Sequence, residues 1–321
     1  MKDTWKFVGC GVLAAALLGG CGGNKSSVSD AKGANSEKKI DDDPVALLPS
    51  AAMVLVNVDA RAVYASGSVG GQVGKLTERL VPIGEEAGFV ASRDLDRVVV
   101  GVYSMQGADV AAVLVGKFDE QKIAQAAQSK APTKGGGVIV ASQYGGRTLY
   151  TLANIGFTVL STRTVVAGTE SGIRRAIDRI KDGRVTRDQP PWMLATLDTS
   201  GAAFASAADF ANQPIGAASV GMIPLPWVQG LKAVRVIGNF HDPGLNIAGT
   251  LTYPDGPRAE AAAAELRKTA AAASFLTMLG VPQLKNLEIK TAQSDTQATF
   301  AVDDQQLRQF LQTAAQYMTP Q

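Results

Sequence analysis

The chain has 321 residues, of which 46% are hydrophobic and 6% aromatic, and its 31 basic and 29 acidic residues nearly cancel. A near-neutral balance without clustered basic residues argues against a nucleic-acid partner. The scarcity of aromatic rings argues against base-stacking platforms. A hydrophobic content this high is sufficient for a sizeable core without disulfide bonds.

The first segment has the pattern of an export signal. A short charged start is followed by an apolar stretch from Phe7 to Leu18 and then by Gly19, Gly20 and Cys21. An apolar run of about a dozen residues fits a signal peptide and is too short for a membrane-spanning helix, which needs about 20. The sequence Leu18-Gly19-Gly20-Cys21 resembles the lipobox of bacterial lipoproteins.

This resemblance implies that the chain is cut between Gly20 and Cys21 and that Cys21 is lipidated. The expected partner is then a membrane, held through the acyl chains on Cys21, and the expected location is extracytoplasmic. Gly22 stands where enteric inner-membrane lipoproteins carry aspartate, which favours an outer-membrane destination in a Gram-negative organism. The alternative is an ordinary secretory signal with an incidental cysteine.

The expected domain boundaries begin with a signal peptide over residues 1–20 and a flexible tether over residues 21–44. The tether is rich in Ser, Gly, Lys and Asp and has almost no apolar side chain. Such a composition cannot bury enough surface to offset the entropy of ordering it. The acidic triplet Asp41-Asp42-Asp43 is interpreted as a solvated end of this tether.

The remaining chain has the pattern of an internal duplication. Strands from Leu95 to Val100 and from Val110 to Phe118, followed by an Ala-rich helix, recur 136 positions later. An earlier segment, Met53 to Asp59, is paired with a second expected strand, Trp192 to Asp198. The expected helices are the segments with apolar residues three and four apart, namely Val73 to Ala87, Glu120 to Gln128, Gly172 to Lys181, Pro257 to Leu279 and Gln305 to Met318.

Short β-branched runs joined by Gly-containing turns predict antiparallel hairpins. Between the expected helices of the first repeat they predict a four-stranded meander over residues 138–167, and in the second repeat a single hairpin over residues 287–302. The predicted fold class is α+β with two related halves, each a mainly antiparallel sheet flanked by helices. The halves are placed at 45–185 and 186–321.

Catalytic motifs are missing from the sequence. His241 is the sole histidine and lies in Phe240-His241-Asp242-Pro243-Gly244, which is typical of an exposed hairpin turn. Without a second histidine or a free thiol, a histidine- or cysteine-based zinc site cannot form. No Gly-x-Ser-x-Gly motif is present to supply a nucleophile. We therefore expect neither a cofactor nor enzymatic activity.

One uncharged stretch is unusual. From Phe210 to Leu231 there are 22 consecutive residues without a charge, and three prolines in it exclude a spanning helix. One interpretation is a loop and short helix laid over the second sheet. The other is an apolar contact site for a ligand or partner, whose candidate residues are Met222, Ile223, Leu225 and Trp227.

Together these patterns favour a lipid-anchored bacterial envelope protein with a non-enzymatic binding or scaffolding role, whose partner is an envelope protein or an apolar ligand. The alternative is a carrier of a lipid or other apolar ligand. A third hypothesis is a hydrolase that uses only carboxylates, serines and lysines. An enclosed apolar pocket above about 300 Å³ would favour the carrier. Two buried carboxylates about 5–10 Å apart in a cleft would favour the hydrolase.

Overall fold

The computed structural model describes residues 39–317 except 68, 82, 105–108, 134–136, 153–154, 214, 216–218, 221–222 and 276–281. The described chain forms two compact units. The N-terminal unit contains residues 39–61 and 74–194, and the C-terminal unit contains residues 62–73 and 195–317. Both combine helices with an antiparallel sheet, so the predicted α+β class is confirmed.

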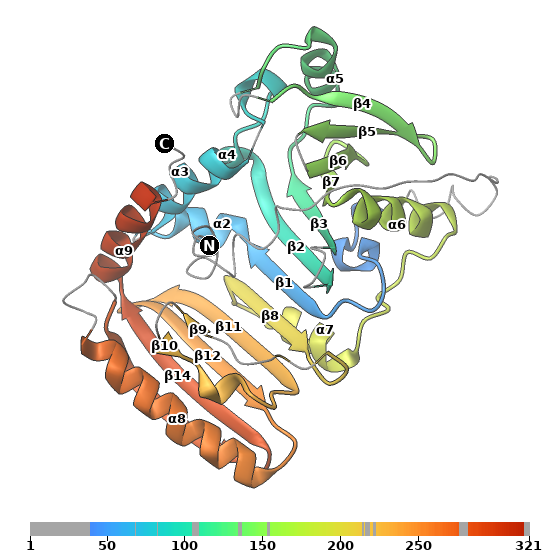
Figure 1. Ribbon diagram of the computed structural model, residues 1–321. Helices are drawn as coiled ribbons and strands as arrows, with labels where there is room; N and C mark the ends of the chain where they lie inside the picture. The colour runs from blue at the N-terminus through green and yellow to red at the C-terminus, as the bar shows by residue number, and fades with distance from the viewer. Residues whose placement is uncertain are drawn as a thin grey trace, which may run out of the picture. The chain divides into compact units, whose positions relative to one another are not determined.

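The N-terminal unit is built on seven strands in the order β1-β2-β3-β7-β6-β5-β4 (Figure 1). All their pairings are antiparallel. Neighbouring strands β4 to β7 follow one another in sequence, which confirms the predicted meander. The strands are β1 (Val54–Asp59), β2 (Leu95–Ser104), β3 (Asp109–Gly116), β4 (Val140–Tyr144), β5 (Arg147–Leu152), β6 (Ile155–Val159) and β7 (Thr164–Gly168).

One long helix covers a face of this sheet. Helix α6 (Glu170–Lys181) contacts β3, β6 and β7 and buries Ile173 and Ile177 completely. Gly156 makes room for Ile173, because a Cβ there would lie 2.9 Å from its terminal methyl carbon. Thr169 caps α6 by accepting a hydrogen bond from Gly172 N.

The shorter helical segments stand before and between the strands. They are η1 (Pro44–Leu47), α2 (Ala60–Ala65), α3 (Gly70–Leu80), η2 (Glu85–Ala87), α4 (Ala91–Asp94), α5 (Glu120–Ser129) and α7 (Pro191–Leu197). The single helix expected from Val73 to Ala87 is instead α3 followed by η2. In the sequence between them, Pro82 and Gly84 disfavour a continuous helix.

The last residues of the expected tether belong to the folded N-terminal unit. Ile40 is 3% exposed. Asp41 accepts hydrogen bonds from Ser161 Oγ at 2.5 Å and Thr164 Oγ1 at 2.6 Å. Asp43 caps η1 through Val45 N and pairs with Arg187. The interpretation of the acidic triplet as a solvated tether end is therefore wrong for Asp41 and Asp43, since side chains distant in sequence bind both carboxylates.

The C-terminal unit is built on five strands in the order β8-β11-β12-β14-β13. Each pair of neighbouring strands in this order is antiparallel. The unit also has a separate two-stranded sheet. The strands are β8 (Phe204–Asp209), β9 (Ser219–Val220), β10 (Ile223–Pro224), β11 (Ala233–His241), β12 (Gly244–Thr252), β13 (Leu284–Ala292) and β14 (Asp295–Asp303). The β11–β12 turn holds His241 exposed at the predicted hairpin tip, and β13–β14 is the predicted single hairpin.

The helical segments of this unit follow β10, β12 and β14 in the chain. They are η3 (Pro226–Val228), α8 (Gly256–Phe275) and α9 (Asp304–Tyr317). Helix α8 contacts β13 and β14, and α9 contacts β12 and β14 (Figure 1). Thr296 Oγ1 donates to Ala259 O of α8 at 2.8 Å, so Thr296 points toward α8. Side chains at the alternate positions of β14 therefore point to the opposite face.

The strand expected from Trp192 to Asp198 is wrong, because helix α7 occupies most of that segment. Pro191 opens the helix, where its missing N–H has no intrahelical partner to lose. Met193 and Leu197, four positions apart, are 0% and 2% exposed. Residues four apart lie on the same face of a helix. A strand with one buried face would instead bury every second side chain. The first strand of the C-terminal unit is β8.

Candidate functional site

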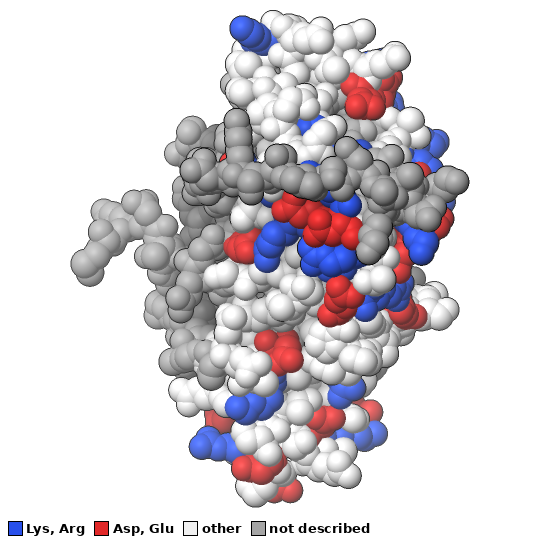
Figure 2. Space-filling view, turned by 90° about the vertical axis from the view of Figure 1, so that its right-hand side faces the viewer, with Lys and Arg blue, Asp and Glu red and all other residues white. Residues whose placement is uncertain are grey.

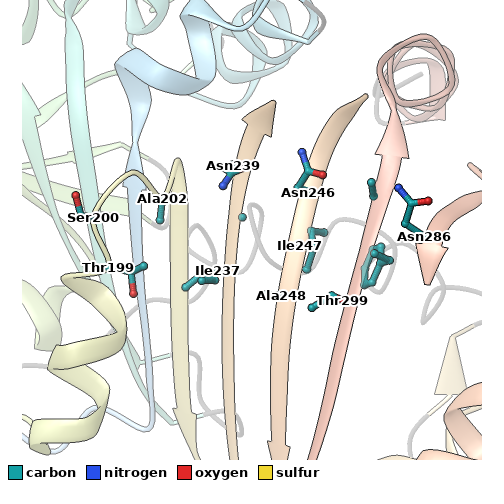
Figure 3. Close-up of a pocket in the computed structure, with 13 residues that line it drawn as sticks. Thr199, Ser200, Ala202, Ile237, Asn239, Asn246, Ile247, Ala248, Asn286 and Thr299 are labelled. Carbon is teal, nitrogen blue, oxygen red and sulfur yellow. The ribbon is translucent and has the colours of Figure 1, made fainter. Parts of the chain in front are cut away.

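A pocket of about 360 Å³ lies on the sheet of the C-terminal unit. Its lining comes from the loop at residues 199–202 and from β11, β12, β13 and β14 (Figure 3). Its volume is near the lower end of the range for small-molecule sites, about 300–1,000 Å³. Among the residues that line it, none is Lys, Arg, His, Asp or Glu. The pocket is therefore uncharged.

The strand register places two rows of side chains in the pocket. Asn239 of β11 lies directly opposite Asn246 of β12. Ile237 lies opposite Ala248, and Ala248 in turn lies opposite Thr299 of β14. Residues paired across antiparallel strands share a face, and Thr299 is on the face opposite to Thr296. A polar row of amides thus stands beside a more apolar row, on the sheet face away from α8.

The two paired asparagines differ in their hydrogen bonds. Asn246 Nδ2 donates to His241 O at 2.9 Å and to Gly244 O at 3.2 Å, both in the β11–β12 turn. Both partners are carbonyl oxygens, so the amide nitrogen must face the turn and Oδ1 must face away from it. Asn239 Oδ1 is buried and has no hydrogen-bond partner. A buried oxygen without a partner is unfavourable, by about 1–3 kcal/mol.

Asn286 and the 199–202 loop border the pocket on its two sides (Figure 3). Asn286 lies at the irregularity between Lys285 and Glu288 in β13 and has φ of 52°. Asparagine tolerates this left-handed backbone better than most residues. On the other side, Thr199 Oγ1 donates to Thr196 O at 2.8 Å. The two sides of the pocket are thus formed by an irregular position in β13 and by a loop rather than by regular strand.

None of these pocket residues was singled out from the sequence. A signal was present for one of them, because asparagine is depleted in strands and Asn246 stands inside a predicted strand, whereas Asn239 lies just beyond the end of the strand predicted before it. Folding the hairpin around the turn at Asp242-Pro243 would have paired them. The sequence does not show in the same way which strands lie beside this hairpin.

A second hollow, in the N-terminal unit, is charged. It has a volume of about 480 Å³ and includes Arg61, Asp96 and Arg163. Arg61 Nε pairs with Asp96 Oδ1 at 2.5 Å, and Arg163 lies 3.7 Å from Asp96 Oδ2. Opposite charges thus neutralise one another inside the hollow. On the face shown in Figure 2, basic and acidic side chains of the described residues are likewise interspersed.

Two carboxyl groups of this hollow, those of Asp94 and Asp96, are held in the ionised form. The hydrogen bond from Arg93 lowers the pKa of Asp94, and the hydrogen bond from Arg61 lowers the pKa of Asp96. A general acid near neutral pH requires the opposite shift, a raised pKa. Asp94 and Asp96 are therefore unsuited to act as the acid of a carboxylate-based hydrolase.

The residues predicted for lipidation and cleavage, Cys21 and Gly20, lie outside the described residues, as does Met222. Ile223 belongs to β10. Leu225 and Trp227 are half-buried. They stand at η3, which packs against α8. The structure therefore places Leu225 and Trp227 on the side of the sheet that α8 covers.

Trp227 combines one satisfied and one unsatisfied polar group. Its carbonyl accepts a hydrogen bond from Tyr253 Oη at 2.5 Å. Burial raises the pKa of Tyr253 to about 12, so this hydroxyl keeps its proton at neutral pH. The indole Nε1 of Trp227 is buried without a partner.

The part of the chain that the structure describes contains no group of three or more His, Cys, Asp or Glu side chains arranged to hold a metal ion. Within the same residues, no helix is both long and apolar enough to span a membrane.

Comparison with known proteins gives structural neighbours only. No protein-family model matches the chain, and no curated protein matches its sequence. The chain is similar to crystal form III of TP0453, with 11% identity, a TM-score of 0.49, and coverage of 84% of this chain and 98% of that one. Crystal forms IV and I of TP0453 have 10% identity and TM-scores of 0.48 and 0.47. They cover 84% and 85% of this chain and 96% and 97% of theirs.

Proposed function

We propose that the protein is a lipid-anchored bacterial envelope lipoprotein with a non-enzymatic binding role. The anchor is assigned to Cys21 at the end of the lipobox-like sequence, with cleavage after Gly20. The membrane partner is held through the acyl chains on Cys21. Gly22 favours the outer membrane over the inner membrane in a Gram-negative envelope.

The observation that carries the binding role is the uncharged pocket of the C-terminal unit. It places amide and hydroxyl groups around a cavity of about 360 Å³ without any ionisable side chain in its lining. Binding needs only complementary hydrogen bonds and shape, whereas general acid–base catalysis needs a titratable group at the reacting atom. A pocket of this composition supports recognition rather than turnover.

The two other hypotheses have less support. A carrier of a lipid or other apolar ligand would need an enclosed apolar cavity, and the asparagine pair of this pocket is poorly suited to one. A carboxylate-based hydrolase would need a carboxyl with a raised pKa, and Asp94 and Asp96 have lowered ones.

We also propose that the two units derive from a duplication. The order β1-β2-β3-β7-β6 corresponds to β8-β11-β12-β14-β13, and α6 follows β7 in the chain as α9 follows β14. In this correspondence β8 is the counterpart of β1. The sequence-based prediction instead takes residues 192–198 as the counterpart. Superposition of the two units in an experimental structure tests this correspondence. Matched strands that superpose only after a change of strand order would contradict the duplication.

The anchor is tested by replacing the cysteine. Cys21→Ala should release the protein from the membrane fraction and abolish incorporation of radiolabelled fatty acid. Cys10→Ala is the matched control, because Cys10 belongs to the expected signal peptide and should leave both measurements unchanged. A Cys21→Ala protein that still incorporates fatty acid and stays in the membrane fraction would refute the proposed anchor.

A further inference from the structure

We propose that the pocket of the C-terminal unit binds a neutral saccharide, with Asn239 and Asn246 accepting hydrogen bonds from its hydroxyl or acetamido groups. The inference rests on the proposed binding function and names the ligand class for the same site.

The charge of the ligand follows from the lining. No ionisable side chain lines the pocket to pair with a charged ligand. Removing an ionised group from water without a partner is costly, so a charged ligand would be bound poorly there. The ligand class is therefore neutral.

The polar character of the ligand follows from the two amides. Asn239 Oδ1 is buried and lacks a partner, while Asn246 Oδ1 is turned away from the backbone carbonyls that its nitrogen contacts. Both oxygens are acceptors that a ligand hydroxyl or N–H can satisfy. An apolar ligand would leave Asn239 Oδ1 unpaired and still further from water. The pocket therefore selects a ligand with several hydrogen-bond donors.

The choice between a saccharide and a peptide follows from the backbone. Strand β11 pairs with β8 and β12, and β12 pairs with β11 and β14, so both strands that carry the asparagines are internal to the sheet. An extended peptide could not add to them as a further strand. Recognition must use side chains, and these offer amides and hydroxyls next to Ile237 and Ala248 (Figure 3). A sugar ring likewise combines a polar part and an apolar part, because its hydroxyl edge is polar and its C–H face is apolar.

The test measures binding to the full-length protein in detergent by isothermal titration calorimetry. The probes are N,N′-diacetylchitobiose, maltose and a blocked neutral tripeptide. We expect at least one of the disaccharides to bind with a Kd of about 1 mM or tighter. Asn239→Leu and Asn246→Leu keep the side-chain size and remove the amide, so each should weaken that binding about tenfold. Gln297→Leu is the control, since Gln297 lies on the same face of β14 outside the pocket lining.

Absence of binding to both disaccharides would overturn the saccharide assignment, as would binding of the tripeptide alone. Disaccharide binding that both asparagine variants retain at full strength would overturn the assignment to this pocket. Circular dichroism of each variant verifies that it is folded. The envelope anchor has its own readout in the Cys21→Ala fractionation, so failure of the saccharide inference leaves that result unaffected.

Discussion

Arg179 and Asp188 form an ion pair in the N-terminal unit in which one partner is buried and the other is not. Arg179 Nη1 lies 2.8 Å from Asp188 Oδ2, and the exposed fractions of the two side chains are 3% and 39%. Arg179 Nη2 also donates to Thr186 O at 2.8 Å and to Ala46 O at 3.4 Å. The guanidinium thus ties helix α6 to η1 and to the segment that follows α6.

The unequal burial of this pair predicts unequal effects of its two partners. Asp188→Ala leaves a buried positive charge without its carboxylate and should lower the free energy of unfolding by about 2–3 kcal/mol. Arg179→Met removes the buried charge itself and should cost less, about 1 kcal/mol. Urea denaturation of both variants measures the difference. A larger loss for Arg179→Met than for Asp188→Ala would contradict this account.

Acid sensitivity follows from the lowered pKa values of Asp94 and Asp96. Each carboxyl has an ordinary pKa of 3.8, and in the folded chain hydrogen bonds from arginines lower it. A group whose pKa is lower when folded contributes stability above its unfolded pKa, and this contribution is lost as the pH falls toward the folded pKa. The free energy of unfolding should therefore be constant from pH 7 to about pH 5 and fall below about pH 4. Urea midpoints measured between pH 7 and pH 3 test this.

Asp96→Asn is the matched variant for the pH experiment. It removes one titrating carboxyl while keeping the shape of the side chain, so the variant should be less stable at pH 7 and lose less stability on acidification. An acid-induced loss equal to that of the wild type would show that Asp96 does not contribute to it.

The acidic triplet offers a direct comparison between neighbouring aspartates. Asp41 and Asp42 are both exposed, but Asp41 accepts hydrogen bonds from Ser161 and Thr164. Asp41→Ala should lower the free energy of unfolding by about 1 kcal/mol, because Asp41 is itself partly in solvent. Asp42→Ala should change it by less than about 0.5 kcal/mol. Equal effects in urea denaturation would mean that the Asp41 contacts do not stabilise the fold.

The paired pocket asparagines should respond to the same substitution with different changes in stability. Asn239→Leu removes a buried oxygen that has no partner, so the free energy of unfolding should stay the same or rise by up to about 1 kcal/mol. Asn246→Leu removes two hydrogen bonds to the β11–β12 turn and should lower it by about 1 kcal/mol. Thermal and urea unfolding measure both. Marked destabilisation by Asn239→Leu would indicate that this residue serves the fold rather than a ligand.

Local patterns predicted much of the fold. Apolar spacing located α5, α6 and α9 to within a few residues, and the Asp-Pro-Gly turn located the β11–β12 hairpin. The same patterns failed for residues 192–198, where a continuous apolar run fits a short helix as well as a strand. They also failed at Asp41 and Asp43, because composition does not reveal that Thr164 and Arg187 contact them.

The sequence by itself determined the α+β class, the hairpins and the helices with clear periodicity, because these depend on residues close together in the chain. It also contains the lipobox-like segment on which the proposed anchor rests. The pocket was decided only by the tertiary structure. Its two rows join β11, β12 and β14, and β14 lies beside β12 although a helix and β13 separate them in sequence. Contacts of that kind depend on the packing of the whole unit, which no local pattern encodes.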